Sequence, residues 1–222
     1  MRSAAALLDE LRRELAPVEA AIRAHPYLEA VEAGRLPRGE LARFAGEQYH
    51  IIRSDLRSVA LLAHRFGAEP SGAFFRAVLG GEAAALDALH AFARALDLDE
   101  ARLEAHEPAP GCQAYAAFMA WLALYESDAA AAAGFLVNFP AWGANCARMS
   151  RALRARYGLG EGATRFFDLF ASPPPDFEAQ ALAVVEGGLA RGADPRRVRR
   201  AARLLQGYEQ LYWDTLEALA RR

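Results

Sequence analysis

Residues 25–58 read HPYLEAVEAGRLPRGELARFAGEQYHIIRSDLRS, and this stretch predicts how the chain begins to fold. A His-Pro pair interrupts the chain, and a short segment then runs to Gly34. Proline is favoured in the first turn of a helix, and glycine is favoured just past a helix end. From PRGE the sequence continues to Phe66 without a further proline. The stretch therefore predicts a short helix that is followed by a long one.

Breakers divide the rest of the chain into further segments with the composition of helices. Alanine and leucine are abundant, β-branched residues are sparse, and no segment alternates with the period of two that a strand requires. Besides the two helices above, we expect helices over about 3–24, 71–96, 112–126, 128–157, 161–170, 176–190 and 194–221. No linker or shift in composition marks a second domain. With the short segments not all counted as full helices, the sequence thus predicts an all-α bundle of seven or eight helices, with residues 1–222 in a single domain.

The charge balance and the cysteines narrow the class of protein. The net charge is −2 and the pI is about 6.2, so there is no basic surplus of the kind that nucleic-acid binding requires. Cys112 and Cys146 stand far apart without a CxxC pattern, which is typical of a reduced protein. Acidic side chains within the first ten residues are not typical of a signal peptide. We therefore expect a cytoplasmic protein with no nucleic-acid partner.

Residues 129–147 carry no charged side chain over a length that could cross a bilayer. Pro140 and two asparagines interrupt this segment, however. A helix that is apolar on all sides is also typical of the centre of a large bundle. We therefore expect a buried core helix here and no membrane partner.

Glu47 and His50 lie three residues apart in the long helix, a spacing that carboxylate-bridged di-iron bundles use for two ligands of one metal. Helical geometry argues against the same role in this chain. At about 100° per residue, Glu47 falls about 80° and His50 about 140° from the centre of the apolar stripe. The stripe consists of Phe44, Ile51, Leu62 and Phe66. We interpret His50 either as a histidine at the surface or between subunits, or as a ligand.

Asp55 falls in the middle of the same stripe, and Gln48 lies close beside it. Asp55 is therefore the polar side chain that we expect to be best buried on this helix. A buried carboxylate is costly unless it is paired or hydrogen-bonded. Two interpretations follow: Asp55 has a structural partner, such as an arginine or a helix end, or it faces a cavity.

The 128–157 helix holds two asparagines that share a face with large apolar side chains. The residues on this face are Asn138, Trp142, Asn145 and Met149. Amides in such a helix either bond a neighbouring helix or line a pocket, which is where polar groups converge in an apolar surround. Cys146 lies on the same side, with no histidine nearby in sequence to activate it, so we expect a buried and inert thiol.

The last helix reads RRAARLLQGYEQLYWDTLEALARR and carries an aromatic face. Its expected inner residues are Leu204, Tyr208, Tyr212, Thr215 and Leu219, with Trp213 widening the buried arc. An aromatic stripe of this kind is more often core than binding site. Glu209 borders the stripe, and a carboxylate among aromatic rings can have the raised pKa that acid–base catalysis uses.

Three segments in this order resemble the thiaminase II (TenA)-like and pyrroloquinoline-quinone-synthase-like proteins, which have the heme-oxygenase architecture. The segments are HPYLEAVEAGRLPRGELARFAGEQY, LEAHEP and YEQLYWD. The last is similar to the closing Tyr-Glu-x-x-Phe-Trp-Asp of thiaminase II. The resemblance covers nearly the whole chain and implies a heme-oxygenase-like, TenA-like helical bundle.

The di-iron oxidase branch of this superfamily is a poor match. Glu82 fits one of its ligands, but Ala or Leu stands where a histidine should follow, and Asn138 stands at the position of a glutamate. The region of its His-x-x-x-Asp-x-x-His motif begins with Phe170 and contains Asp176 but no histidine. The resemblance therefore implies no metal site in this chain, and we expect no cofactor.

Thiaminase II uses a nucleophilic cysteine, an aspartate on the long helix and the glutamate of the closing helix. Glu209 matches that glutamate. Ile51 stands at the position of the aspartate, and Asp55 follows one turn later on the same face. The cysteine would fall near position 139 or 140, whereas Cys146 lies one to two turns away.

The resemblance implies a protein that binds a small nitrogen heterocycle in a central cavity, with C–N bond hydrolysis as the reaction if it is an enzyme. Glu209 would act as acid and base, and Asp55 would hold a ring amine. We expect the ligand to be held by Gln48, Glu47, Glu82, Asn138, Trp142, Tyr208 and Tyr212. The alternatives are a metal-dependent or cofactor-free oxidase in a biosynthetic pathway, and a degenerate binding protein without activity. The resemblance also implies a homodimer or higher homo-oligomer.

Overall fold

The computed structural model describes residues 3–221, and over these residues the chain forms helices and no strand. The helices are α1 (Ala4–Arg23), α2 (Pro26–Glu32), α3 (Arg38–Arg65), α4 (Ser71–Arg94), α5 (Glu100–Glu104), α6 (Pro110–Tyr125), α7 (Asp128–Tyr157), α8 (Glu161–Ala171), α9 (Phe177–Ala190) and α10 (Pro195–Ala220). The all-α prediction is confirmed. The helix α5 was not predicted, because its five residues lie in a polar segment without an apolar period.

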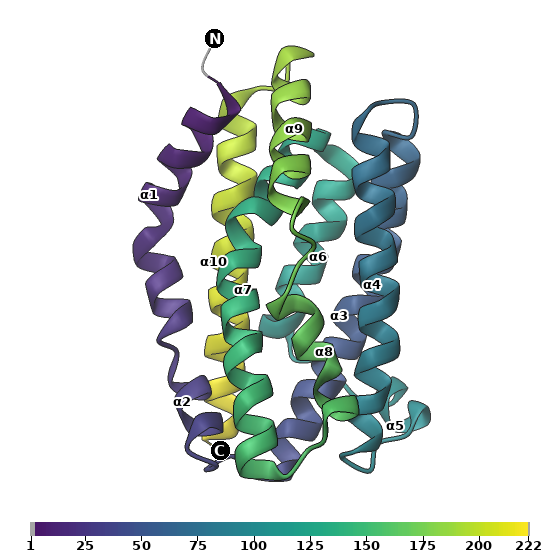
Figure 1. Cartoon of the computed structure of the whole chain (residues 1–222), viewed down its shortest axis with the longest axis vertical. Coiled ribbons are helices and arrows are strands. Elements are labelled where there is room, and N and C mark those ends of the chain that lie inside the picture. The colour runs from purple at the N-terminus through teal and green to yellow at the C-terminus, as the bar shows by residue number, and fades with distance from the viewer. Residues whose placement is uncertain (1–2, 222) are drawn as a thin grey trace.

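The long helices run along the longest axis of the molecule (Figure 1). In that view α1, α10 and α7 form the left side and α3 and α4 the right side, while α8 and α9 cross the front and α6 lies behind. The most extensive packing joins α3 to α4, α10 to α7, and α7 to α8. The helices α3, α4, α7 and α10 thus enclose a common interior.

Helix boundaries follow the sequence signals. Asp194 caps α10 by accepting a hydrogen bond from the backbone N–H of Arg196, and Pro195 occupies the first turn. Ser127 caps α7 in the same way through the N–H of Ala130. The other end of α7 stops at Gly158, whose φ of 67° favours glycine. These signals fix both ends of α7 and the start of α10.

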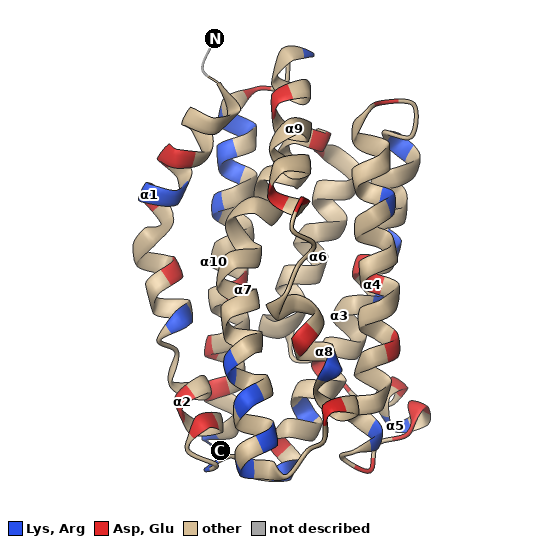
Figure 2. Cartoon of the chain, in the orientation of Figure 1, with Lys and Arg blue, Asp and Glu red and all other residues tan. Residues whose placement is uncertain are grey.

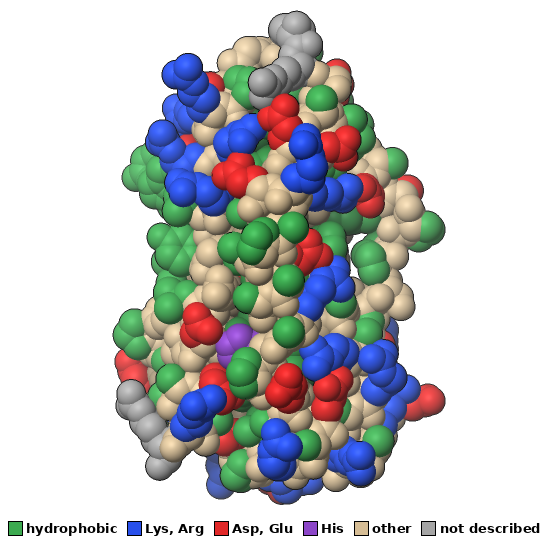
Figure 3. Space-filling model, turned by 90° about the vertical axis from the view of Figure 1, so that its left-hand side faces the viewer, with side chains coloured by type: hydrophobic (Ala, Val, Ile, Leu, Met, Phe, Trp, Pro, Cys, Tyr) green, Lys and Arg blue, Asp and Glu red, His purple; other side chains and the backbone are tan. Residues whose placement is uncertain are grey.

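In the N-terminal half of α7 every residue from Asp128 to Asn138 is buried, as predicted for this part of 129–147, whereas Pro140 is exposed. Figure 2 shows this half in tan and the arginines of α7 only toward its C-terminal end. No helix among the described residues is long and apolar enough to cross a membrane. Seen from the side of α1, arginine and acidic side chains are interspersed over the surface (Figure 3), and Arg199 bridges Glu10 and Glu14 there.

The apolar interior consists of two separate cores stacked along the bundle. One contains Phe44, Phe92, Phe167 and Trp213, and the other contains Phe74, Phe75, Phe135 and Leu205. On α3 the first core reaches Ile52 and the second starts at Val59. The other long helices have the same break between the cores, at 79–84 on α4, 138–140 on α7 and 206–211 on α10. We call the polar side chains at this break the polar layer; its members are Asp55, Glu82, Asn138, Gln206 and Glu209.

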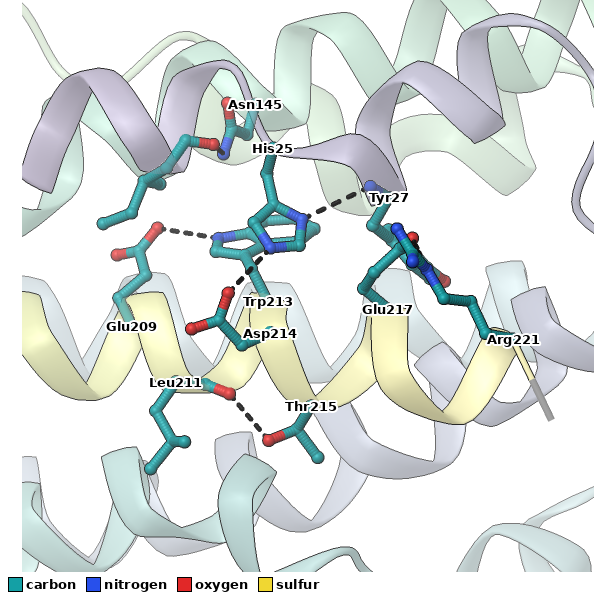
Figure 4. A network of polar contacts seen from close by, with 11 residues as sticks. His25, Tyr27, Asn145, Glu209, Leu211, Trp213, Asp214, Thr215, Glu217 and Arg221 are labelled. Carbon is teal, nitrogen blue, oxygen red and sulfur yellow. Dashed lines mark hydrogen bonds and ion pairs between the residues drawn. The ribbon is translucent and has the colours of Figure 1, made fainter.

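The His-Pro segment and the closing helix are tied together, as Figure 4 shows. The Nδ1 atom of His25 accepts a hydrogen bond from the backbone N–H of Tyr27, so the proton of the neutral ring is on Nε2. That Nε2 lies 3.1 Å from Oδ1 of Asp214. The rings of His25 and Tyr27 also pack against Trp213. These contacts hold the start of α2 against the C-terminal half of α10.

Two expectations about helix faces are wrong. The inner face of α10 is centred one residue later than predicted, on Leu205, Glu209, Tyr212 and Leu216. Glu209 therefore lies in the middle of that face and Tyr208 at its edge. On α3, Glu47 is 1% exposed and Asp55 is 7% exposed, so Glu47 is the better buried of the two. The helix α3 packs on two neighbours, whereas the predicted apolar stripe describes only one face. Glu47 lies on the other face, against the segment that leads into α6.

Gly143 allows α8 to end close against α7. A Cβ atom at this position would lie 2.7 Å from the carbonyl oxygen of Phe170. We expect Gly143→Ala to lower the free energy of unfolding by about 1–3 kcal/mol, because the backbone of α8 has to move away. Gly80, in the exposed middle of α4, has no atom within 4 Å of such a Cβ. The control Gly80→Ala should raise stability by about 0.5–1 kcal/mol, as measured by urea denaturation. Equal effects of the two substitutions would contradict the close approach.

Candidate functional site

The polar layer surrounds a small internal chamber. Asp55 comes from α3, Glu82 from α4, Asn138 from α7 and Glu209 from α10, so four long helices each supply one polar side chain. The other lining residues are Gln48, Ile51, Ile52, Tyr115, Phe139, Trp142, Phe170 and Tyr212. The volume of the chamber is about 50 Å³. Since one water needs roughly 10–15 Å³ on this measure, the chamber has room for a few waters or for the polar edge of a ring.

A larger, mainly apolar cavity of about 580 Å³ adjoins the chamber. The two share Glu82, Phe139, Trp142 and Phe170 as lining residues. The segment 172–176, which joins α8 to α9 and contains three prolines, lines the outer cavity. The outer cavity therefore lies between this segment and the chamber, and three aromatic rings and Glu82 form the boundary between the two spaces.

Glu209 is held in place from two sides. Asn138 donates a hydrogen bond from Nδ2 to Oε2. Trp213 donates from Nε1 to Oε1 at 3.2 Å, as Figure 4 shows. The side chain is only 3% exposed. Burial raises the pKa of Glu209 to about 7, although the two hydrogen bonds oppose this by stabilising the carboxylate. A carboxyl group with this pKa can both give and take a proton near neutral pH.

Asp55 and Glu82 form a second acidic group on the opposite side of the chamber. Burial raises the pKa of Asp55 well above its usual range, and the nearby carboxylate of Glu82 raises it further. Glu82 keeps part of its surface toward the outer cavity, yet burial still raises its pKa to about 7. Oδ1 of Asp55 is buried and has no hydrogen-bond partner within the described residues. An unpaired oxygen of this kind is available to a ligand.

Amide and hydroxyl groups complete the lining. Gln48 donates a hydrogen bond from Nε2 to the hydroxyl oxygen of Tyr212 at 2.8 Å, which leaves the phenol proton free to point elsewhere. The hydroxyl of Tyr115 donates to Oδ1 of Asn138 at 3.2 Å. Asn138 is thereby oriented so that its amide nitrogen faces Glu209. The chamber offers both hydrogen-bond donors and hydrogen-bond acceptors.

Most of the side chains singled out in the sequence meet in this chamber. Those that line it are Gln48, Asp55, Glu82, Asn138, Trp142, Glu209 and Tyr212. For Asp55, the cavity interpretation therefore fits the structure. Asn145 instead bonds a neighbouring helix, which was the alternative to lining a pocket: its Nδ2 donates a hydrogen bond to the backbone carbonyl of Ile22 in α1.

Glu47 and Tyr208, which were predicted together with the other ligand-binding residues, do not line the chamber. Oε1 of Glu47 accepts a hydrogen bond from the backbone N–H of Ala109 and lies 3.2 Å from Nε2 of His106. Glu47 is one residue, about 100° of helix, away from Gln48, and therefore faces α5 and α6 instead. Tyr208 packs on Phe118 of α6, with ring centroids 5.1 Å apart.

Sequence reasoning missed Tyr115, Phe139 and Phe170. Tyr115 belongs to α6, whose residues are so uniformly apolar that no polar face stands out. Phe139 neighbours Asn138 and was considered only as a position for a cysteine. Phe170 ends a short helix, and its place beside Trp142 depends on the tertiary contact at Gly143. The neighbours Asn138 and Trp142 were the only signals that could have indicated Phe139.

The cysteines and the Glu-x-x-His pair lie outside the chamber. Cys112 and Cys146 are free, and burial raises the pKa of both thiols above the usual value. His50 is half-buried and its ring stacks on that of His106 at 6.2 Å. The chamber lining contains no imidazole. Within the described residues, no group of three or more His, Cys, Asp or Glu is arranged to hold a metal ion. The donors present do not fit the ligand set of a di-iron centre.

The raised pKa of Glu209 predicts a pH-dependent stability that a substitution can isolate. The folded protein keeps this proton up to about pH 7, whereas an unfolded glutamate releases it near 4.5. Its stabilising contribution is therefore complete below pH 4.5 and is lost as the pH rises through 7. We expect the stability of Glu209→Gln relative to wild type to increase by about 1–3 kcal/mol from pH 5 to pH 8. Urea denaturation over this range tests it.

The exposed Glu107 supplies the control, because Glu107→Gln should leave the pH dependence of unfolding as it is in wild type. Parallel stability curves for Glu209→Gln and wild type would show that Glu209 is already ionised at pH 5 in the folded protein, contrary to its burial.

Several solved structures have the same fold. A TenA homologue from Pseudomonas syringae pv. tomato superposes with a TM-score of 0.82 at 13% identity, covering 95% of this chain and 92% of that one. A TenA homologue from P. horikoshii gives 0.76 at 17% identity, covering 95% and 97%. A domain of unknown function with a heme oxygenase-like fold from Shewanella denitrificans gives 0.75 at 15% identity, covering 96% and 92%.

A comparison with curated proteins finds no match. The structural likenesses establish the heme oxygenase-like fold. The family follows from the sequence itself, because a family model described as TENA/THI-4/PQQC matches residues 12–164, more than half of the chain. The chain therefore belongs to the TENA/THI-4/PQQC family.

Proposed function

We propose that this protein binds a small nitrogen heterocycle at the chamber. One observation carries the proposal: three carboxyl groups, on α3, α4 and α10, line a single chamber that has no Arg, Lys or His among its lining residues. Carboxyl groups in this setting favour a partner with several N–H donors or a positive charge. An amino-substituted nitrogen ring has both properties and is flat enough to enter between aromatic side chains.

The ligand is held in two ways. Asp55, with its unpaired Oδ1, accepts a hydrogen bond from the ring amine, and Gln48 and Tyr212 orient the polar edge. Trp142 and Phe170, whose rings are 5.7 Å apart, contact the faces of the ring at the boundary with the outer cavity. This placement suits a chamber that is too small for a whole substituted ring.

The reaction that suits this arrangement is hydrolysis of a C–N bond. Glu209 takes a proton from a water molecule while the water oxygen forms a bond to the ring-bound carbon. The C–N bond then breaks, and Glu209 returns the proton to the leaving nitrogen. A carboxyl pKa near 7 suits both steps. Water attacks directly in this scheme, because no thiol lines the chamber.

Binding without turnover is the second candidate, and the position of Cys146 favours it. The thiaminase II resemblance implies a nucleophilic thiol beside the ligand, whereas Cys146 is buried outside the chamber with a raised pKa. For the oxidase alternative, Glu82 is the one residue that matches a ligand of the di-iron oxidases. Iron analysis after expression in iron-supplemented medium tests that alternative, and near-stoichiometric iron would support it.

We also propose a cytoplasmic location, a single working domain and a homodimer. Both cysteines are free, as in a reducing compartment. Helices from both halves of the chain line the chamber, so neither half contains it alone.

On the outer face of α6, Trp121, Leu124 and Tyr125 are exposed, and Leu211 of α10 is exposed as well. Large exposed apolar side chains of this kind are typical of a two-fold interface.

Glu209→Gln should separate chemistry from folding. It keeps the volume of the side chain but cannot carry a proton, so turnover of thiamine or aminopyrimidines should fall about a hundredfold. Asp55→Asn should weaken ligand binding in a thermal-shift titration, and Glu107→Gln should change neither. Absence of both turnover and thermal shift for wild type at millimolar ligand would contradict the proposed function.

Light scattering tests the homodimer. We expect about twice the chain mass of 24.1 kDa at micromolar concentration. Replacing Trp121 and Tyr125 together by Glu should return the mass to that of one chain, because both side chains are exposed on α6. The same double change at Ala83 and Asp87, exposed on α4, should leave the assembly intact. A mass near 24 kDa for wild type would refute the dimer.

A further inference from the structure

At its aromatic rim the chamber adjoins a cavity about ten times its volume. The inner space measures about 50 Å³ and the outer about 580 Å³. A small heterocycle bound at the inner end leaves almost all of the outer cavity empty. Glu82 is the one charged side chain that lines both spaces, so it stands where they meet.

Charge along this route has a single sign. Asp55, Glu82 and Glu209 lie at the inner end, and Asp176 lies on the outer cavity. No Arg, Lys or His lines either space. An anionic ligand, such as a carboxylate or a phosphate, would find no cationic partner along the whole path and would be repelled by every carboxylate that is ionised. A cation, in contrast, gains a charged partner at each stage.

The walls of the outer cavity are apolar apart from Glu82, Ser172, Asp176 and Gln180. Phe74 and Val78 come from α4, Leu169 from α8, and Phe177 from α9. Three consecutive prolines at 173–175 also line it, and proline has no backbone N–H to offer to a polar ligand. This part of the site therefore favours a hydrocarbon group, and it offers few hydrogen-bonding partners to a polar group.

We propose that the physiological ligand is a cationic amphiphile, whose amine or amidine head lies beside Glu82 in the acidic chamber and whose hydrophobic body fills the outer cavity. This inference rests on the proposed binding site and adds the charge and the shape of what enters it. The head carries the N–H donors that the chamber requires, and the body displaces water from apolar walls. The ligand is therefore larger than a simple aminopyrimidine.

Calorimetric titration with simple amphiphiles at pH 7 tests the proposal. Octylamine should bind at least about tenfold more tightly than butylamine, because its four additional methylene groups become buried. Octanol and octanoate have the same tail with a neutral and a negative head. Both should bind at least about tenfold more weakly than octylamine.

Three variants separate the contribution of the head from that of the tail. Glu82→Gln should weaken octylamine at least about tenfold without affecting octanol, because only octylamine loses a charged partner. Ala84→Trp narrows the outer cavity and should lower the ratio of octylamine to butylamine affinity. Ala83→Trp, at an exposed neighbouring position that lines neither space, should leave the ratio unchanged.

Equal affinities for octylamine and butylamine, or octanoate binding as tightly as octylamine, would overturn the proposal. If aminopyrimidines still bind in an Asp55-dependent manner in that case, the proposed function stands and only this inference fails. If neither aminopyrimidines nor amines bind, both fail together.

Discussion

The interior of this bundle depends on a buried layer of polar side chains between two apolar cores. Burying carboxyl groups without a cation is costly, and proteins reduce that cost by hydrogen bonding and by keeping the groups protonated. Glu209 uses both means, through Asn138 and Trp213 and through a pKa near 7. Asp55 and Glu82 keep the proton but have fewer partners. Among the residues that line the chamber, the unmet hydrogen bonding lies at Oδ1 of Asp55, where a ligand can satisfy it.

The surrounding fold holds this layer in register. Asn138 links α7 to α10 through Glu209, while His25 and Trp213 join the start of α2 to the same part of α10 (Figure 4). Gly143 brings the end of α8 close enough for Phe170 to close the chamber beside Trp142. The chamber is therefore assembled from contacts between helices that are distant in sequence. Its shape responds to packing changes that touch none of its own residues.

The sequence predicted the helices well and the site in part, and the reason differs from residue to residue. Capping residues and prolines act locally, so the starts of α7 and α10 could be predicted from neighbouring residues. Asp55 and Glu209 could be found because each is an acid on an apolar face. Glu47 was misplaced because α3 packs on two sides, and a helical wheel describes one. Phe170 and Tyr115 could not be predicted, since nothing local distinguishes them from ordinary core residues. The function is less determined, because the same chamber suits hydrolysis and simple binding.

The central claim is that the polar layer keeps carboxyl groups protonated near neutral pH until a ligand replaces the proton. Infrared spectra of a pH titration test this most directly, because a protonated carboxyl group has a carbonyl band that the carboxylate lacks. We predict such a band in wild type at pH 6, with a titration midpoint near 7 and with reduced amplitude in Glu209→Gln. If wild type at pH 6 shows no band from a buried protonated carboxyl group, the chamber carboxyl groups are already ionised at pH 6 and the account is wrong.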